Sequence, residues 1–135
     1  VLGYPDRARQ IKPALEFLYA SDLPVYSSSK IYNGLQRSDL DRDLSGIQFT
    51  AMPWTFSGHL SAELKSDVTM HTAYRQLYAM GYDTFLVHRN IDNLQLEPKM
   101  PLFGSTGILS LEDGVITRRT QWGEFQKGQA RPTTP

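Results

Sequence analysis

The sequence contains no cysteine among its 135 residues, so the chain can form no disulfide, no thiolate metal site and no thiol nucleophile. Net charge is also lacking, because 14 Lys and Arg residues balance 14 Asp and Glu residues. The chain therefore has no long-range field of the kind that captures nucleic acids or anionic membranes, and we expect neither partner. No apolar run approaches the roughly 20 residues that span a bilayer, and there is no signal-peptide pattern.

What is present describes an ordinary globular sequence, with 40% hydrophobic and 11% aromatic residues. The length suits one compact domain. Residues 1–5, however, resemble the last residues of a buried strand followed by a loop, with no lead-in. We therefore expect the chain to be a fragment of a larger fold.

The first fifty residues predict a parallel α/β unit, in the order strand, helix, strand. The spacing of apolar residues predicts a helix of about four turns, with Asp6 as its N-cap. These residues recur at three- and four-residue spacing and are Ala8, Ile11, Leu15 and Leu18. Pro13 fits this helix only if the helix begins nearer Gln10, which places Pro13 in its first turn. A short strand over 23–26 then ends in the polar run 27–29.

Residues 30–45 are polar and predict a surface loop. Its aspartates at 39, 41 and 43 resemble a calcium loop but lack the required glycine and glutamate. Residues 46–52 alternate as a strand, which Pro53 and Trp54 end.

A long helix is predicted over residues 67–90, with one stripe formed by Met70, Tyr74, Leu77, Gly81, Phe85 and His88. Gly81 indicates either a C-cap or a close approach of another backbone. Residues 92–103 predict a loop. Residues 107–111 and 115–120 flank Glu-Asp-Gly and predict a β-hairpin, with 122–125 extending its second arm and 130–135 forming a frayed tail.

Catalytic patterns are scarce. The three histidines, His59, His71 and His88, include no pair spaced to share a metal on a helix. No serine lies in a nucleophile elbow, and residues 104–107 lack the lysine of a phosphate loop and predict a bend instead. Residues 27–29 follow a strand, where a ligand contact is possible, but a plain polar loop start is the interpretation that we favour. We therefore predict no catalytic residue, no metal and no cofactor.

Several segments along nearly the whole chain resemble the LpoA (LppC) family of Gram-negative outer-membrane lipoproteins. They are PVYSSS at 24–29, GIQF at 46–49, MPW at 52–54, LYAMGYD at 77–83, residues 104–110, RR at 118–119 and QW at 121–122. Residues 73–83 and 103–119 are also similar to the closing segment of type I periplasmic-binding-protein folds. The resemblance implies an α/β fold, the C-terminal half of a two-lobed domain, with parallel sheets flanked by helices and a late β-hairpin.

The resemblance also implies how the chain is divided between lobes. Residues 1–52 would form a βαβ segment of the second lobe, and residues 53–104 a crossover with a helix of the first. Residues 105–135 would return to the second lobe with the hairpin and tail. Residues 50–54 and 104–107 would then be hinge strands.

The family implies a non-catalytic activator that binds a class A penicillin-binding protein, the bifunctional peptidoglycan synthase. It also implies a periplasmic location, with attachment to the outer membrane by a lipid on an N-terminus absent from this sequence. The alternative is a periplasmic solute-binding protein that holds a small amino-acid-like or muropeptide ligand between its lobes. Candidate ligand or partner contacts beyond the strand ends are Tyr4, Ser27, Ser28, Trp54 and Asp83. The bulk of residues 52–54 favours the activator, because these side chains would plug a ligand cleft.

Overall fold

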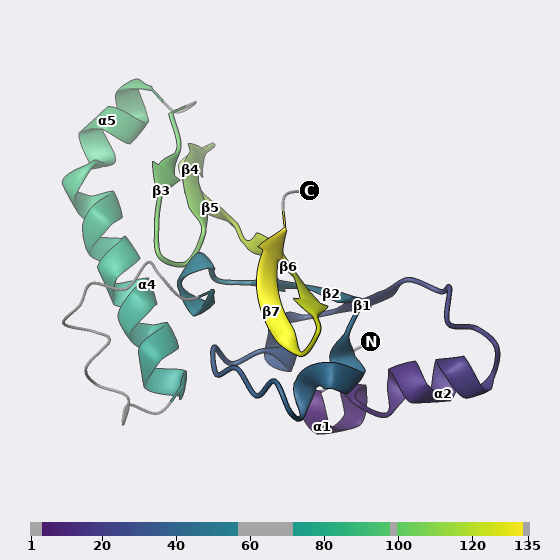
Figure 1. The fold of residues 1–135 in the computed structure, drawn as a ribbon. Coiled ribbons are helices and arrows are strands. Elements are labelled where there is room, and N and C mark those ends of the chain that lie inside the picture. Colours follow the sequence, from purple (N-terminus) through teal and green to yellow (C-terminus); the bar gives the residue numbers. More distant parts are fainter. Residues whose placement is uncertain (1–3, 57–71, 98–99, 134–135) are drawn as a thin grey trace. The chain divides into compact units, whose positions relative to one another are not determined.

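The computed structural model describes residues 4–56, 72–97 and 100–133 of the chain (Figure 1). The chain folds into two compact units. Unit 1 consists of residues 1–51 and 121–135, and unit 2 consists of residues 52–120. The chain therefore leaves unit 1 after Ala51 and returns to it at Gln121.

The start of unit 1 is two short helices instead of the one predicted helix. Helix α1 spans Pro5–Ala8 and helix α2 spans Ile11–Phe17, with a visible break between them (Figure 1). A proline inside a helix lacks an N–H and collides with the carbonyl four residues earlier. Pro13 is tolerated because α2 begins at Ile11, which is the alternative that the sequence left open.

The predicted cap and the predicted apolar stripe of this region are only partly correct. Tyr4, and not Asp6, is the cap residue of α1, because Pro5 already occupies the first helical position. Ala8 is fully buried, whereas Leu18 at the other end of the stripe is exposed. The break between α1 and α2 turns the stripe away from one common face.

Unit 1 is built on a four-stranded sheet, sheet A, with strand order β1-β2-β6-β7. Its strands are β1 (Val25–Ser27), β2 (Ile47–Ala51), β6 (Gln121–Gln126) and β7 (Gln129–Thr133). Strands β1 and β2 are parallel, as predicted, but β2–β6 and β6–β7 are antiparallel. The expectation of parallel sheets therefore holds for one pair of strands in the described residues.

The end of the chain forms a β-hairpin. The strand predicted over 122–125 is present as β6, but its predicted pairing and the predicted tail over 130–135 are wrong. Strand β6 does not extend the preceding hairpin, because it pairs with β2 in sheet A. Strand β7 takes the place of the predicted frayed tail. The turn residues Lys127 and Gly128 have φ values of 52° and 77°, the left-handed conformation that a two-residue hairpin turn needs.

The core of unit 1 lies on one face of sheet A. Tyr32 lies 5.7 Å from Phe49 and 5.9 Å from Phe125 between ring centroids, and Phe49 and Phe125 are 4.9 Å apart. Two short 3₁₀ helices, η1 (Ser29–Ile31) and η2 (Asp41–Leu44), supply further buried side chains. The surface-loop prediction for residues 30–45 is therefore only partly correct. Most of these residues are exposed, but Ile31, Tyr32, Asp41 and Leu44 are buried.

Unit 2 contains a three-stranded antiparallel sheet, sheet B, with strands β3 (Leu102–Phe103), β4 (Ile108–Glu112) and β5 (Val115–Arg119). Strands β4 and β5 form the predicted hairpin, with Asp113 and Gly114 at φ 49° and 77°. The bend predicted at 104–107 is confirmed as the turn between β3 and β4. The resemblance implied that residues 105–135 group together. In the structure residues 105–120 fall in unit 2, because β4 and β5 pair within sheet B.

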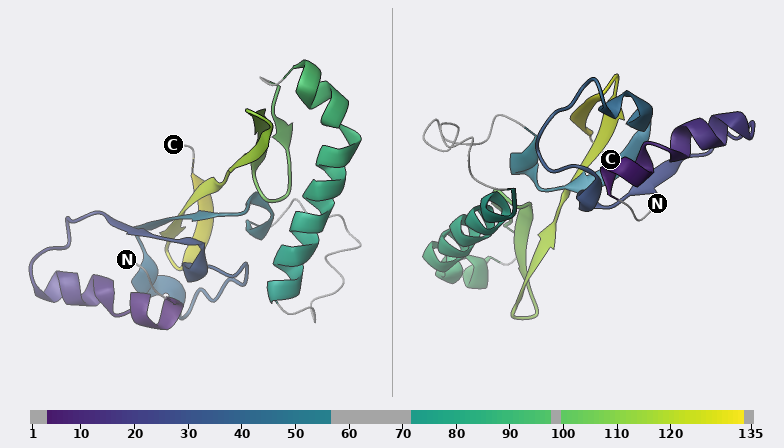
Figure 2. Two further views of the ribbon diagram at one scale, coloured as in Figure 1. Left: turned by 180° about the vertical axis from the view of Figure 1, so that it is seen from behind. Right: turned by 90° about the horizontal axis from the view of Figure 1, so that it is seen from below.

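Two consecutive helices precede sheet B. Helix α4 spans Thr72–Arg89 and helix α5 spans Ile91–Leu96, and Asn90 separates the two. Figure 2 shows both helices in two further views. The predicted helix end is confirmed, and its predicted start at residue 67 lies outside the described residues. The loop prediction for residues 92–103 is wrong, because α5 and β3 occupy most of it.

Helix α4 buries a narrow inner face and exposes an apolar outer one. Ala79 and Asp83 are buried, whereas Tyr74, Leu77 and Phe85 of the predicted stripe are exposed. Gly81 continues the helix, and nothing described lies within 4 Å of the position of a Cβ atom there. Neither predicted role of Gly81 is found in the described part of the chain.

Candidate functional site

Asp83, one of the five candidate residues, accepts three hydrogen bonds within unit 2. Its side chain is buried on the inner face of α4. Its Oδ1 accepts a hydrogen bond from the Ser105 backbone N–H at 2.7 Å, and its Oδ2 accepts bonds from the Thr106 N–H at 2.8 Å and the Thr106 hydroxyl at 2.6 Å. Bonds to an ionised carboxylate are stronger than neutral ones. Asp83 therefore fastens the turn between β3 and β4 to helix α4.

Gly104 makes this attachment possible. A Cβ atom at Gly104 would lie 2.6 Å from Oδ2 of Asp83, well inside van der Waals contact. The backbone of the turn can approach the carboxylate only because residue 104 has no side chain. The pattern of Gly-Ser-Thr-Gly is thus explained by an internal contact.

Trp54 is joined to the same turn. It lies in the 3₁₀ helix η3 (Pro53–Thr55), is 7% exposed, and donates its backbone N–H to the Ser105 carbonyl at 3.2 Å. Its indole Nε1–H points to the Met52 sulfur at 3.3 Å. The structure therefore brings Trp54 and Asp83 together at Ser105, within unit 2.

The other three candidates belong to unit 1. Tyr4 is 66% exposed, and its carbonyl accepts the first backbone bonds of α1. Ser27 ends β1, and Ser28 precedes η1, where its carbonyl accepts the Ile31 N–H at 3.2 Å. Both serines are half-buried. Their assignment as ligand or partner contacts stays a prediction.

These side chains do not form a catalytic constellation in the described residues. Asp83 uses both oxygens on internal donors, and Trp54 is enclosed, so neither is placed to act on a substrate. Within residues 4–56, 72–97 and 100–133, no three His, Asp or Glu side chains cluster closely enough to hold a metal ion. His59 and His71 lie outside the described residues. In the same ranges no helix is both long and apolar enough to cross a membrane.

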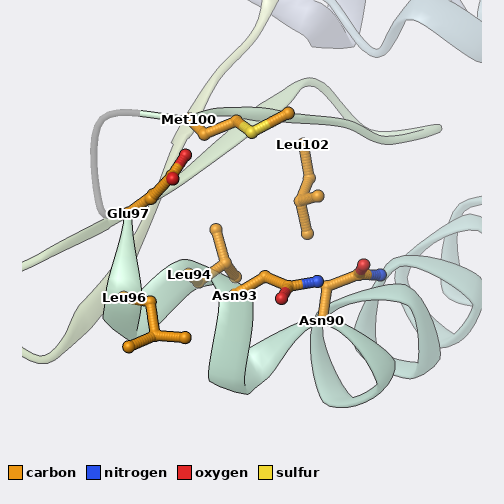
Figure 3. Close-up of a pocket in the computed structure, with 7 residues that line it drawn as sticks. All are labelled: Asn90, Asn93, Leu94, Leu96, Glu97, Met100 and Leu102. Carbon is orange, nitrogen blue, oxygen red and sulfur yellow. The ribbon is translucent and has the colours of Figure 1, made fainter.

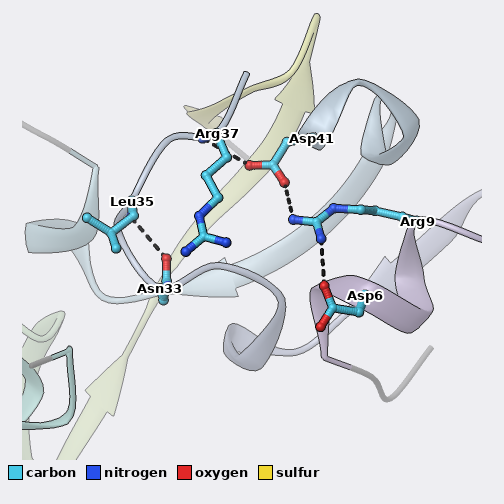
Figure 4. Close-up of polar contacts among 6 residues, drawn as sticks. All are labelled: Asp6, Arg9, Asn33, Leu35, Arg37 and Asp41. Carbon is cyan, nitrogen blue, oxygen red and sulfur yellow. Dashed lines mark hydrogen bonds and ion pairs between the residues drawn. The ribbon is translucent and has the colours of Figure 1, made fainter. Parts of the chain in front are cut away.

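A buried ion pair in unit 1 was not predicted from the sequence (Figure 4). Arg9 donates to Asp41 Oδ1 at 2.9 Å and to Asp6 Oδ1 at 2.7 Å, and Asp41 Oδ2 accepts the Arg37 backbone N–H at 3.3 Å. The side chains of Arg9 and Asp41 are 18% and 7% exposed. This pair joins α1 to η2, and the only sequence signal for it is Asp41, the second aspartate of the cluster that predicted a loop.

Tyr32 lies close to this ion pair in the core. Burial raises the pKa of the Tyr32 hydroxyl above its usual 10.0, and the negative charge of Asp41 adds to the rise, whereas a hydrogen bond with Gln36 lowers it. The hydroxyl is thus held in its neutral form. The Tyr32 hydroxyl therefore affects the stability of the fold at alkaline pH, and no described residue around it suits it to catalysis.

Unit 2 has a small cavity of about 250 Å³ between α5 and the start of β3 (Figure 3). Its lining is Asn90, Asn93, Leu94, Leu96, Glu97, Met100 and Leu102. This volume is below the range of about 300–1,000 Å³ that is usual for small-molecule sites. The Asn90 amide already donates to the Leu86 carbonyl at 2.8 Å, so it offers little to a ligand.

The fold is that of the periplasmic-binding-protein class. A structure from Chromobacterium violaceum, described as "a putative branched-chain amino acid ABC transporter", matches 90% of this chain with a TM-score of 0.63 and 24% identity, and the match covers 40% of that chain. LpoA from Haemophilus influenzae matches 99% of this chain with a TM-score of 0.81 and 26% identity, and the match covers 26% of that chain. The predicted α/β class and fold are confirmed by these matches.

Sequence comparison gives the family. The model of the family described as "LppC putative lipoprotein" matches residues 1–128, and the chain belongs to this family. Penicillin-binding protein activator LpoA from Klebsiella pneumoniae is 27% identical over 139 residues, which cover 99% of this chain and 20% of that protein. The LpoA C-domain from Haemophilus influenzae, "a regulator of PBP1A", matches with a TM-score of 0.79 and 26% identity over 98% of this chain and 43% of its own. The chain spans about a fifth of the length of its curated relatives.

Proposed function

We propose that this chain is part of a non-catalytic activator of a class A penicillin-binding protein and that it acts by binding this peptidoglycan synthase. The observation that carries the proposal is the family match over residues 1–128. Relatives that match 98–99% of the chain are named as penicillin-binding protein activators, and one matching domain is described as a regulator of PBP1A. The same proposal places the full-length protein in the periplasm, held at the outer membrane by a lipid, and the description of the family as a lipoprotein supports it.

An activator of this kind needs no catalytic residue. It shifts its partner toward an active conformation if it binds that conformation more tightly than the inactive one. A tenfold preference corresponds to about 1.4 kcal/mol, which a few surface contacts can supply. The internal bonds of Asp83 and Trp54 suit a rigid scaffold that presents such contacts, and exposed Tyr4 is available for one of them.

The direct test uses the full-length protein and the purified synthase. We expect the protein to raise the rate of glycan polymerisation or of peptide crosslinking in proportion to the amount bound. Tyr4→Ala should weaken the complex if Tyr4 is a contact, and Tyr19→Ala is the matched control, because Tyr19 is 97% exposed and was not selected as a contact. A saturated complex with an unchanged synthase rate would refute the proposal.

The second candidate function is solute binding, which the fold class favours. In that case a small amino-acid-like or muropeptide ligand would bind between two lobes. Calorimetric titration of the full-length protein with amino acids and muropeptides separates the two functions. A saturable heat that is lost in Ser27→Ala or Ser28→Ala would favour the solute-binding protein.

A further inference from the structure

The two faces of sheet A differ sharply in chemistry. The inner face carries Ile47, Phe49 and Phe125, which are all buried beneath η1 and η2. Alternate residues point outward, and on the outer face these are polar or aromatic. None of the outward positions of β1, β2, β6 and β7, all of which the structure describes, is lysine or an aliphatic residue.

An aromatic pair stands on this outer face. Tyr26 on β1 and Trp122 on β6 lie 6.2 Å apart in an edge-to-face arrangement, on either side of β2. Tyr26 is 51% and Trp122 is 37% exposed. A sheet face that is to be covered by an apolar helix is rich in Val, Ile and Leu, and this face is not. The rings are therefore exposed on a face that lacks the aliphatic residues of a helix-covered sheet.

A polar row continues from the aromatic pair across all four strands. Tyr26 is opposite Gln48, Gln48 is opposite Glu124, and Glu124 is opposite Arg131. Three strand spacings of about 4.8 Å make this row about 14 Å long. The Gln48 amide offers both a donor and an acceptor, and the single carboxylate and single guanidinium leave the row without net charge.

We propose that the outer face of sheet A is a binding surface for a glycan chain. Sugar rings, which have an apolar face and a polar rim, stack on Tyr26 and Trp122, and their hydroxyl groups bond to the row of Gln48, Glu124 and Arg131. The neutral, amide-rich composition matches an uncharged polyhydroxylated chain better than a nucleic acid or an anionic lipid. The absence of aliphatic residues from these outward positions also distinguishes the surface from the apolar centre of a protein interface.

The test is titration of the full-length protein with a soluble β-linked tetramer of N-acetylglucosamine, followed by calorimetry. We expect saturable binding with a Kd of about 1 mM, as suits a shallow and hydrated site. Trp122→Ala and Tyr26→Ala should each weaken binding about tenfold, whereas Trp122→Phe, which keeps a ring, should weaken it no more than about threefold. Gln48→Ala and Arg131→Ala change exposed side chains only and test the row if an aromatic variant does not fold.

The matched control is Tyr74→Ala, which removes a 64% exposed ring from α4 in unit 2. Its glycan affinity should equal that of the parent protein. An equal loss in Tyr74→Ala, or no saturation up to about 10 mM, overturns the proposal. It is also overturned if Trp122→Ala keeps its glycan affinity but no longer binds the synthase, because the surface would then dock a protein. Glycan binding by a protein that fails to activate the synthase would support this surface and refute the proposed function alone.

Discussion

Replacing Asp83 should detach the turn between β3 and β4 from helix α4. Three donors converge on its buried carboxylate: the backbone N–H groups of Ser105 and Thr106 and the Thr106 hydroxyl. Each hydrogen bond to a charged group contributes about 1.5–3 kcal/mol, and a buried donor left without a partner costs about 1–3 kcal/mol. Ser105 is half-buried, so water can replace part of its bond. We therefore expect Asp83→Ala to lower the free energy of unfolding of unit 2 by about 3–5 kcal/mol.

Milder substitutions should give smaller losses, since Asp83→Asn and Thr106→Val each remove only part of the hydrogen bonding between Asp83 and the turn. Asp83→Asn keeps one acceptor oxygen but turns an NH₂ group toward a donor, and should cost about 2–3 kcal/mol. Thr106→Val removes only the hydroxyl donor and should cost about 1–2 kcal/mol. Asp22→Asn, at an exposed aspartate, is the control and should change stability by less than about 0.5 kcal/mol.

Amide hydrogen exchange of the full-length protein is the suitable assay, because it reports this turn without requiring two-state unfolding. The loss of about 2–3 kcal/mol expected for Asp83→Asn should accelerate exchange of the Ser105 and Thr106 amides by about 30- to 150-fold, and Asp83→Ala should accelerate it more. Their exchange should be unchanged in the Asp22 control. Unchanged protection of both amides in Asp83→Ala would refute the reasoning, because it would mean that the carboxylate does not hold the turn.

Three further predictions concern other parts of the chain. Gly81→Ala should stabilise the protein by about 0.5–1 kcal/mol in thermal unfolding, because the site is helical and open. Gly104→Ala should destabilise it by about 1–3 kcal/mol, because the added Cβ atom would clash with the Asp83 carboxylate. A change of the same sign in both variants would contradict this reasoning. Arg9→Met leaves the buried charge of Asp41 unpaired and should cost about 3–5 kcal/mol in denaturant, and a variant within about 1 kcal/mol of the parent would show that water replaces the pair. Because the pKa of Tyr32 is raised in the folded state, the stability that this group contributes is complete below pH 10 and falls as the pH rises through the folded pKa. Tyr32→Phe should therefore flatten the loss of stability above about pH 10, and equal slopes would contradict the assignment.

Local patterns predicted those elements whose boundaries depend on neighbouring residues. The β4–β5 hairpin was predictable because Asp113 and Gly114 supply the left-handed turn. The hairpin of β6 and β7 was missed because its turn uses Lys127, which is not a typical residue for positive φ. Pro132 is tolerated since β7 is an edge strand among the described residues.

Contacts between distant residues could not be predicted from spacing. Asp83 was selected as a cleft residue, but its partners lie 22 and 23 positions further along the chain. Arg9 and Asp41 are 32 positions apart, and no periodic pattern connects them. The aromatic pair of Tyr26 and Trp122 is likewise created by the antiparallel pairing of β2 with β6, whereas the local pattern had placed β6 beside the preceding hairpin.

The point at which the chain leaves and re-enters unit 1 has a practical consequence for protein engineering. Ala51 and Gln121 are directly opposite each other at the end of the β2–β6 ladder. Residues 52–120 can therefore be excised and the two strand ends joined by an Asn-Gly turn, since a two-residue turn of this kind connects adjacent antiparallel strands. The product is a continuous meander of β2, β6 and β7 that retains β1 and the whole outer face of sheet A, a minimal module for display or for crystallisation with a glycan.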